Sequence, residues 1–160
     1  MTQLTEAYDH IDDVKSLFSE YTNMLVTIDL SFSLYLDIQH YDDEAQDPAV
    51  KYAPPKGRLY LALHGGKAAG CIALRPLSDD RCELKRLYVR PQFRGNGIAG
   101  MLCERILEDA VKTGYREIYL DTLPELSDAI RLYEKLGFTY TDCYNDSPLD
   151  KTVFMKKALI

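Results

Sequence analysis

A glycine-containing turn at residues 92–99 is the segment of this chain best suited to bind an anion. It reads Gln92-Phe93-Arg94-Gly95-Asn96-Gly97-Ile98-Ala99, and a helical pattern follows it. Gly95 and Gly97 have no Cβ, so a bulky ligand could lie directly against the main chain there. The first N–H groups of a helix have no intrahelical partner and lie at the positive end of the helix dipole. The turn therefore predicts a binding site for a phosphate or pyrophosphate, with Arg94 as an additional positive charge.

This turn has to be positioned by a strand before it and a helix after it. The strand is predicted over residues 82–89, and Pro91 marks its end because proline has no N–H to donate to a sheet. Gly114 is expected to end the helix in a left-handed conformation. The helix itself is predicted because apolar residues recur at four-residue intervals after the turn, at Ile98, Leu102, Ile106 and Ala110.

The strand before the turn changes its alternation of apolar residues. Cys82 and Leu84 have one parity, whereas Leu87 and Val89 have the other, so the pattern flips across Lys85-Arg86. Because side chains along a strand alternate with a period of two, the flip predicts one extra residue, a β-bulge. A bulge leaves backbone groups unpaired, and these groups are then available to a ligand.

The turn also fits one known phosphate-binding pattern and lacks the key residues of another. Gly95-Asn96-Gly97-Ile98-Ala99-Gly100 matches G-x-G-x-x-G, and Asp121 follows about 20 residues later, as in dinucleotide-binding folds. Such a fold places this motif after its first strand and needs further βαβ units, whereas several strands precede it here and too little chain follows. An NAD-binding domain is therefore the less favoured alternative. A Walker-type loop is excluded because no Gly-Lys-Ser/Thr follows the glycines.

Two motifs in a fixed order carry a resemblance to a known family. Gln92-x-x-Gly95-x-Gly97, preceded by Leu87-Tyr88-Val89, is followed by Ala129-x-x-x-Tyr133-x-x-x-Gly137-Phe138. This arrangement resembles the GNAT superfamily of acetyl-CoA-dependent N-acetyltransferases, over roughly residues 58–157 by motif order and spacing. The chain departs from the family at Leu126, where relatives often carry an asparagine. The resemblance implies a single domain over residues 1–160, with a variable substrate-side segment (1–57) and a cofactor-binding core (58–157).

The resemblance also implies how acetyl-CoA is bound. The backbone of Leu87, Tyr88 and Val89 would pair with the pantetheine arm as an added strand, and an N–H near Val89 would polarise the thioester carbonyl. The residues of the turn would hold the pyrophosphate, namely Gln92, Arg94, Gly95, Asn96, Gly97, Ile98 and Ala99.

Two residues are candidates for the proton transfers that N-acetyl transfer requires. By resemblance, Tyr133 is the tyrosine that protonates the departing thiolate, although an aromatic residue on the apolar face of a helix is more often part of a core. Glu83 is the candidate base, since some relatives use a carboxylate on the equivalent strand. This role requires a raised pKa, and a residue facing solvent or paired with Lys85 is the competing interpretation. Asp121 or a water relay could take the role instead.

The remaining chain predicts further strands and helices around this core. Gly65-Gly66 indicates a hairpin turn between strands at 59–64 and 68–75. Asp9 is the expected N-cap of an amphipathic helix from Ile11 to Ile28, and Thr122-Leu123-Pro124-Glu125 fits a capping box before a helix at 126–136. The other expected elements are a strand at 2–7, a helix at 32–39, an acidic loop at 42–47 that continues to residue 57, and strands at 117–121, 138–144 and 151–156. Together they predict an α/β fold with a mostly antiparallel, mixed sheet of six to seven strands and helices on both faces.

Composition limits the kinds of partner and compartment. The chain has 160 residues, 46% hydrophobic and 28% charged, with a net charge of −6, which argues against a nucleic-acid partner. No apolar run is long enough to span a membrane and the N-terminus lacks a signal-peptide pattern, so a cytoplasmic location is expected. The four cysteines show no C-x-x-C spacing, so no metal is expected.

The sequence thus predicts an acetyl-CoA-dependent N-acetyltransferase that transfers the acetyl group directly to a primary amine of a small molecule, peptide or protein. The acidic segment at 42–47 would suit a cationic or polyamine-like acceptor. Dimerisation is compatible with the resemblance, although nothing in the sequence demands a homodimer. A catalytically idle CoA-binding or regulatory domain is the alternative from another functional class.

Overall fold

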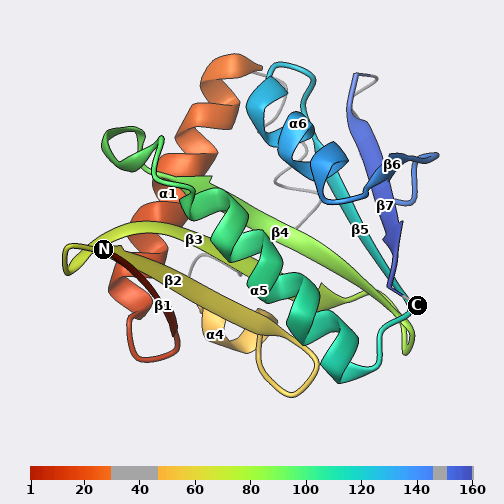
Figure 1. Ribbon diagram of the computed structural model, residues 1–160, viewed down its shortest axis with the longest axis horizontal. Helices are drawn as coiled ribbons and strands as arrows, with labels where there is room; N and C mark the ends of the chain where they lie inside the picture. Colours follow the sequence, from red (N-terminus) through yellow and green to blue (C-terminus); the bar gives the residue numbers. More distant parts are fainter. Residues whose placement is uncertain (30–46, 146–150, 160) are drawn as a thin grey trace.

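The computed structural model describes residues 1–29, 47–145 and 151–159. Within them, seven strands form one sheet in the order β1-β2-β3-β4-β5-β7-β6 (Figure 1). All neighbouring strands are antiparallel except β4 and β5. The predicted mixed sheet is therefore confirmed. The strands are β1 (Thr2–Glu6), β2 (Arg58–His64), β3 (Lys67–Pro76), β4 (Arg81–Val89), β5 (Glu117–Thr122), β6 (Thr139–Tyr140) and β7 (Val153–Ala158).

Helices cover both faces of the sheet, as predicted (Figure 1). Ile106 and Tyr133, from α5 and α6, share one buried cluster with Ile72 of the sheet. Phe18 of α1 belongs to a second cluster with Ala73, which follows Ile72 in β3 and therefore lies on the opposite face. The helical segments are α1 (Ile11–Ile28), α4 (Pro48–Lys51), the short 3₁₀ turn η1 (Pro91–Phe93), α5 (Ile98–Thr113) and α6 (Ser127–Lys135).

The hairpin and the bulge predicted from the sequence are both present. Gly65 and Gly66 have φ of 58° and 79° and join β2 to β3. In the next ladder, Cys71 lies opposite Tyr88 and Ala73 lies opposite Lys85, so one residue of β3 faces the two residues 86–87 of β4. The extra residue is accommodated at Arg86, the one non-glycine residue with positive φ (61°) in the described part of the chain.

The parallel pair β4 and β5 separates after a short contact. Its register runs only through Arg81 opposite Glu117, Cys82 opposite Ile118, and Glu83 opposite Tyr119. Beyond Glu83, β4 keeps β3 on one side, whereas no strand pairs with its other edge in the described residues. The fold thus opens the sheet directly before the glycine-containing turn.

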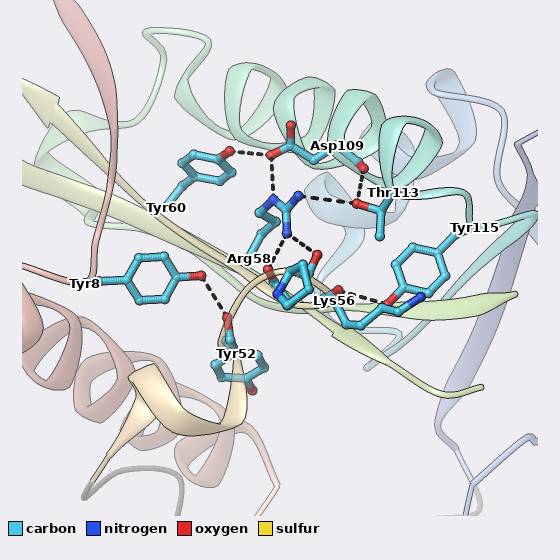
Figure 2. A network of polar contacts seen from close by, with 10 residues as sticks. Tyr8, Tyr52, Lys56, Arg58, Tyr60, Asp109, Thr113 and Tyr115 are labelled. Carbon is cyan, nitrogen blue, oxygen red and sulfur yellow. Dashed lines mark hydrogen bonds and ion pairs between the residues drawn. The ribbon is translucent and has the colours of Figure 1, made fainter. Parts of the chain in front are cut away.

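The C-terminal end of α5 is attached to the loop that precedes β2 (Figure 2). The Arg58 guanidinium donates to the carbonyl oxygens of Pro55 and Gly57 at 2.6 and 2.7 Å and forms an ion pair with Asp109 at 3.7 Å. Asp109 also accepts a hydrogen bond from the hydroxyl of Tyr60. Polar contacts with β2 and the loop before it therefore fix the C-terminal end of α5, the helix that begins at the turn.

Gly114 ends α5 in the predicted left-handed conformation, whereas both predicted N-terminal helix caps were wrong. The N-cap of α1 is His10 rather than Asp9, and no side chain caps the helix there. The segment starting at Thr122 forms no capping box, because Thr122 still pairs with Val153 in the sheet and its backbone is extended. The helix predicted at 126–136 is present as α6, which begins at Ser127 with Leu126 as its N-cap.

Two other expectations change, and two more cannot be compared with the structure. Residues 48–51, predicted as loop, form α4, in which the fixed φ of Pro48 suits the first helical turn. The strand predicted at 138–144 is shorter: β6 spans Thr139–Tyr140, and the Thr141 N–H also donates to the Phe154 oxygen of β7 at 2.9 Å. The helix predicted at 32–39 and the acidic loop at 42–46 lie outside the described residues.

Candidate active site

The glycine-containing turn has open space where a ligand could lie against its main chain. Gly95 and Gly97 have φ of 84° and 73°, so both need the left-handed conformation that glycine tolerates. A Cβ placed on Gly95, Gly97 or Gly100 would meet no described protein atom within 4 Å. In the described part of the chain, the first α5 amide with a main-chain partner is that of Met101, which donates to the Gly97 oxygen at 3.1 Å. The amides before it are the donors that a diphosphate requires.

The side chains of the turn mostly stabilise the turn itself. Arg94 Nε donates to the Val89 carbonyl oxygen at 3.1 Å, and Asn96 Nδ2 donates to the Phe93 oxygen at 2.8 Å. Gln92 is exposed and Ala99 is half-buried, whereas the side chain of Ile98 packs in the core. Among these residues, Ile98 can therefore offer a ligand only its main chain.

A pocket lies where β4 and β5 separate. Its walls come from residues 84–87 of β4, residues 121–123 at the end of β5, Tyr133 and Leu126 near α6, and Tyr21 and Leu25 of α1. Two predicted site residues, Leu87 and Tyr133, therefore line one pocket. Tyr88 and Val89 continue β4 from this pocket toward the turn and are buried.

Tyr133 keeps its proton in this environment. Its side chain is 5% exposed, and its ring lies 5.7 Å from that of Phe138. Burial raises the pKa of the phenol well above its ordinary value, because the charged phenolate would lose its hydration. The hydroxyl is thus a proton donor throughout the physiological pH range.

Glu83 does not have the raised pKa that we predicted for a base. Burial disfavours its charged form, but Lys85, Arg75 and the hydroxyl of Tyr144 outweigh burial and lower the pKa. Arg75 Nε lies 2.7 Å from Glu83 Oε1, and the Tyr144 hydroxyl donates to Oε2. Glu83 is fully buried and is not among the residues that line the pocket. The lowered pKa does not favour a role as base, and that role stays a prediction.

The pocket also contains polar residues that were not assigned to it from the sequence, in addition to Asp121, which was an alternative candidate base. Lys85 and Arg86 lie at the bulge and are only 6% and 5% exposed. Tyr21 comes from α1, and Asp121 accepts a hydrogen bond from Asn145 Nδ2 at 2.7 Å. The parity flip that predicted the bulge was the signal for Lys85 and Arg86, because a bulge turns neighbouring side chains to the same face.

The fold and site together define a class of protein, the acetyl-CoA-dependent acetyltransferases. Their features here are a sheet that opens at its parallel pair, an open glycine-containing turn at the start of a helix, and a buried tyrosine at the opening. The model of the Acetyltransferase (GNAT) family matches residues 18–138, and the chain belongs to this family.

Individual relatives agree with this assignment. An uncharacterised N-acetyltransferase of Schizosaccharomyces pombe is 38% identical over 148 residues, which cover 91% of this chain and 86% of that protein. The PaiA N-acetyltransferase of Thermoplasma acidophilum, solved in complex with coenzyme A, has a TM-score of 0.76 at 16% identity and 99% coverage of both chains. A GNAT acetyltransferase of Elizabethkingia anophelis with acetyl-CoA bound has a TM-score of 0.58 at 23% identity, covering 72% of this chain and 82% of its own. The two structures show a shared fold.

Two further observations concern metals and membranes. The described residues contain no group of three or more His, Cys, Asp or Glu side chains that could hold a metal ion. They also contain no helix of the length and apolar character needed to cross a bilayer.

Proposed function

We propose that this protein binds acetyl-CoA at the turn 92–99 and transfers its acetyl group directly to a primary amine in the adjoining pocket. The observation that carries the proposal is that three features adjoin one another. They are the open glycine turn, the edge of β4 with which no described strand pairs beyond Glu83, and the pocket lined by Tyr133. The solved relatives that hold acetyl-CoA and coenzyme A support the choice of ligand.

The main chain supplies most of the binding groups in this proposal. The N–H groups from Gly95 to Gly100 would receive the diphosphate, with Arg94 beside them. The free edge of β4 at 87–89 would pair with the pantetheine arm as an added strand. Because the Arg90 N–H donates to Ala69 of β3 at 2.8 Å, and successive N–H groups alternate along a strand, the Val89 N–H points to the open edge. It is thus the donor proposed to polarise the thioester carbonyl.

The reaction then needs one acid and one base. The neutral amine attacks the thioester carbon, the new C–N bond forms, and the C–S bond breaks with its electron pair on sulfur. Tyr133, which burial keeps protonated, donates its proton to that thiolate. The proton released by the amine passes to Asp121 or to water in the pocket, because Glu83 does not line it.

A thiol-release assay with acetyl-CoA and a panel of amines, combined with calorimetric titration of CoA, tests the proposal. The proposal predicts CoA binding and turnover of at least one amine. CoA binding without turnover of any amine would favour the idle or regulatory CoA-binding domain. A protein that binds no CoA would contradict both.

A further inference from the structure

The bulge in β4 places two cationic side chains next to each other in the pocket. Lys85 lies opposite Ala73, which belongs to the cluster on the α1 face of the sheet. The guanidinium of Arg86, one residue later, lies 5.9 Å from the ring centre of Phe18 in α1. Consecutive residues of a regular strand point to opposite faces, so the bulge is what brings both side chains to one face.

A buried carboxylate, Glu83, lies on the same face of the sheet as these cations. It comes two residues before Lys85, is held by Arg75 and Tyr144, and has its charged form favoured by the charge of Lys85. Lys85 and Arg86 have partners within the chain. Ammonium and guanidinium groups carry three and five N–H donors, so each can donate to a ligand as well.

One carboxylate lies on the opposite wall of the pocket. Asp121 is two residues after Tyr119, which lies beside Glu83 in the register, so Asp121 also belongs to the α1 face. Asn145 holds it through the 2.7 Å hydrogen bond. Among the described residues, the charged groups lining the pocket are therefore two cations on β4 and one anion at the end of β5.

We propose that the acceptor is an amine that also carries a carboxylate, as an amino acid does; this inference rests on the proposed acetyl transfer. Lys85 and Arg86 receive the carboxylate, and Asp121 receives the amino group. A polyamine would instead place a second ammonium against two largely buried cations, and like charges in a poorly solvated site repel strongly. This assignment differs from the cationic acceptor expected from residues 42–47, most of which lie outside the described residues.

The test compares matched acceptors with the intact protein. Free amino acids are assayed by thiol release against their own α-carboxamides, which keep the amine and lack the negative charge, and against diaminobutane. The best free amino acid is expected to exceed its carboxamide in kcat/KM by about tenfold or more. Equal or faster turnover of the carboxamides or of diaminobutane would overturn the inference while leaving acetyl transfer intact. No thiol release with any acceptor would overturn acetyl transfer itself.

Substitutions of Lys85 and Arg86 test whether these two residues cause the preference for an acceptor with a free carboxylate. In Lys85→Met and Arg86→Gln the ratio of kcat/KM between the free acid and its carboxamide is expected to fall toward one. Lys112→Gln, which removes an exposed cation in the last turn of α5, is the control and should keep the wild-type ratio. Wild-type discrimination in both pocket variants, each shown by calorimetry to bind CoA, would overturn the roles given to Lys85 and Arg86. If either variant fails to fold, the acceptor comparison with the wild-type protein decides alone.

Discussion

Tyr133 is expected to act through its hydroxyl rather than its ring. Tyr133→Phe keeps the buried ring and removes the proton, so kcat should fall by about 10²- to 10⁴-fold while the dissociation constant for CoA stays unchanged. Thiol release and calorimetry measure the two quantities. Tyr140→Phe, at an exposed tyrosine in β6, is the control. Full turnover in Tyr133→Phe would assign Tyr133 to packing.

The lowered pKa of Glu83 predicts that the folded protein loses stability in acid. Its pKa is lower in the folded chain than the ordinary 4.5, because Lys85, Arg75 and Tyr144 outweigh the effect of burial. An acid with a depressed folded pKa stabilises the fold fully above its unfolded pKa, and this stabilisation is lost as the pH falls through the folded value.

Urea unfolding at a series of pH values checks this expectation. The wild-type free energy of unfolding should decline as the pH falls below about 4.5. Glu83→Gln should be less stable by about 3 kcal/mol at neutral pH, since it leaves the buried Lys85 without its anionic neighbour, and should show a weaker decline in acid. Glu104→Gln, at an exposed position of α5, should follow the wild type. If the free energy of unfolding of Glu83→Gln declined with pH in parallel with that of the wild type, Glu83 would not be the source of the instability in acid.

The turn and α5 form the element on which CoA binding depends. Gly97→Leu should weaken CoA affinity by about tenfold or more, because a side chain would enter the space left for the ligand. Because leucine would have to adopt the left-handed φ of 73° at this position, the variant should also lose about 1–2 kcal/mol of stability.

Gly114→Leu is the matched control, because Gly114 has φ of 99° and open space at the other end of the same helix. It should lose comparable stability and keep its CoA affinity in calorimetry. Equal CoA affinity in the two variants would contradict the binding role of the turn.

Local patterns predicted the elements better than they predicted the site. The parity flip at Lys85-Arg86 and the Gly65-Gly66 pair specify backbone geometry within a few residues, so bulge and hairpin were found. The capping box proposed before α6 was wrong because Thr122 is held by β7, about 30 residues later in the chain. The lowered pKa of Glu83 depends likewise on Tyr144, which local sequence does not bring near β4.

The whole molecule should discriminate between two nucleotide ligands. A ligand that binds only the folded chain stabilises it by about 2.7 kcal/mol at a concentration of 100 times its dissociation constant. CoA should therefore raise the melting temperature, whereas NAD should leave it unchanged, because the sheet lacks the βαβ repeats of a dinucleotide fold. Thermal denaturation with each ligand measures the difference. Stabilisation by NAD alone would restore the dinucleotide alternative.

The contacts of Arg58 link the two predicted parts of the chain, residues 1–57 and 58–157. Arg58 binds the carbonyl groups of Pro55 and Gly57 on one side and contacts Asp109 and Thr113 of α5 on the other (Figure 2). Local opening of either side should therefore expose amides on both. Arg58→Met is expected to speed deuterium uptake at residues 52–57 and in the last turn of α5 together, with little change near Gly97. Mass spectrometry of peptide fragments would reveal this coupling, and faster uptake on one side alone would show that the two parts open independently.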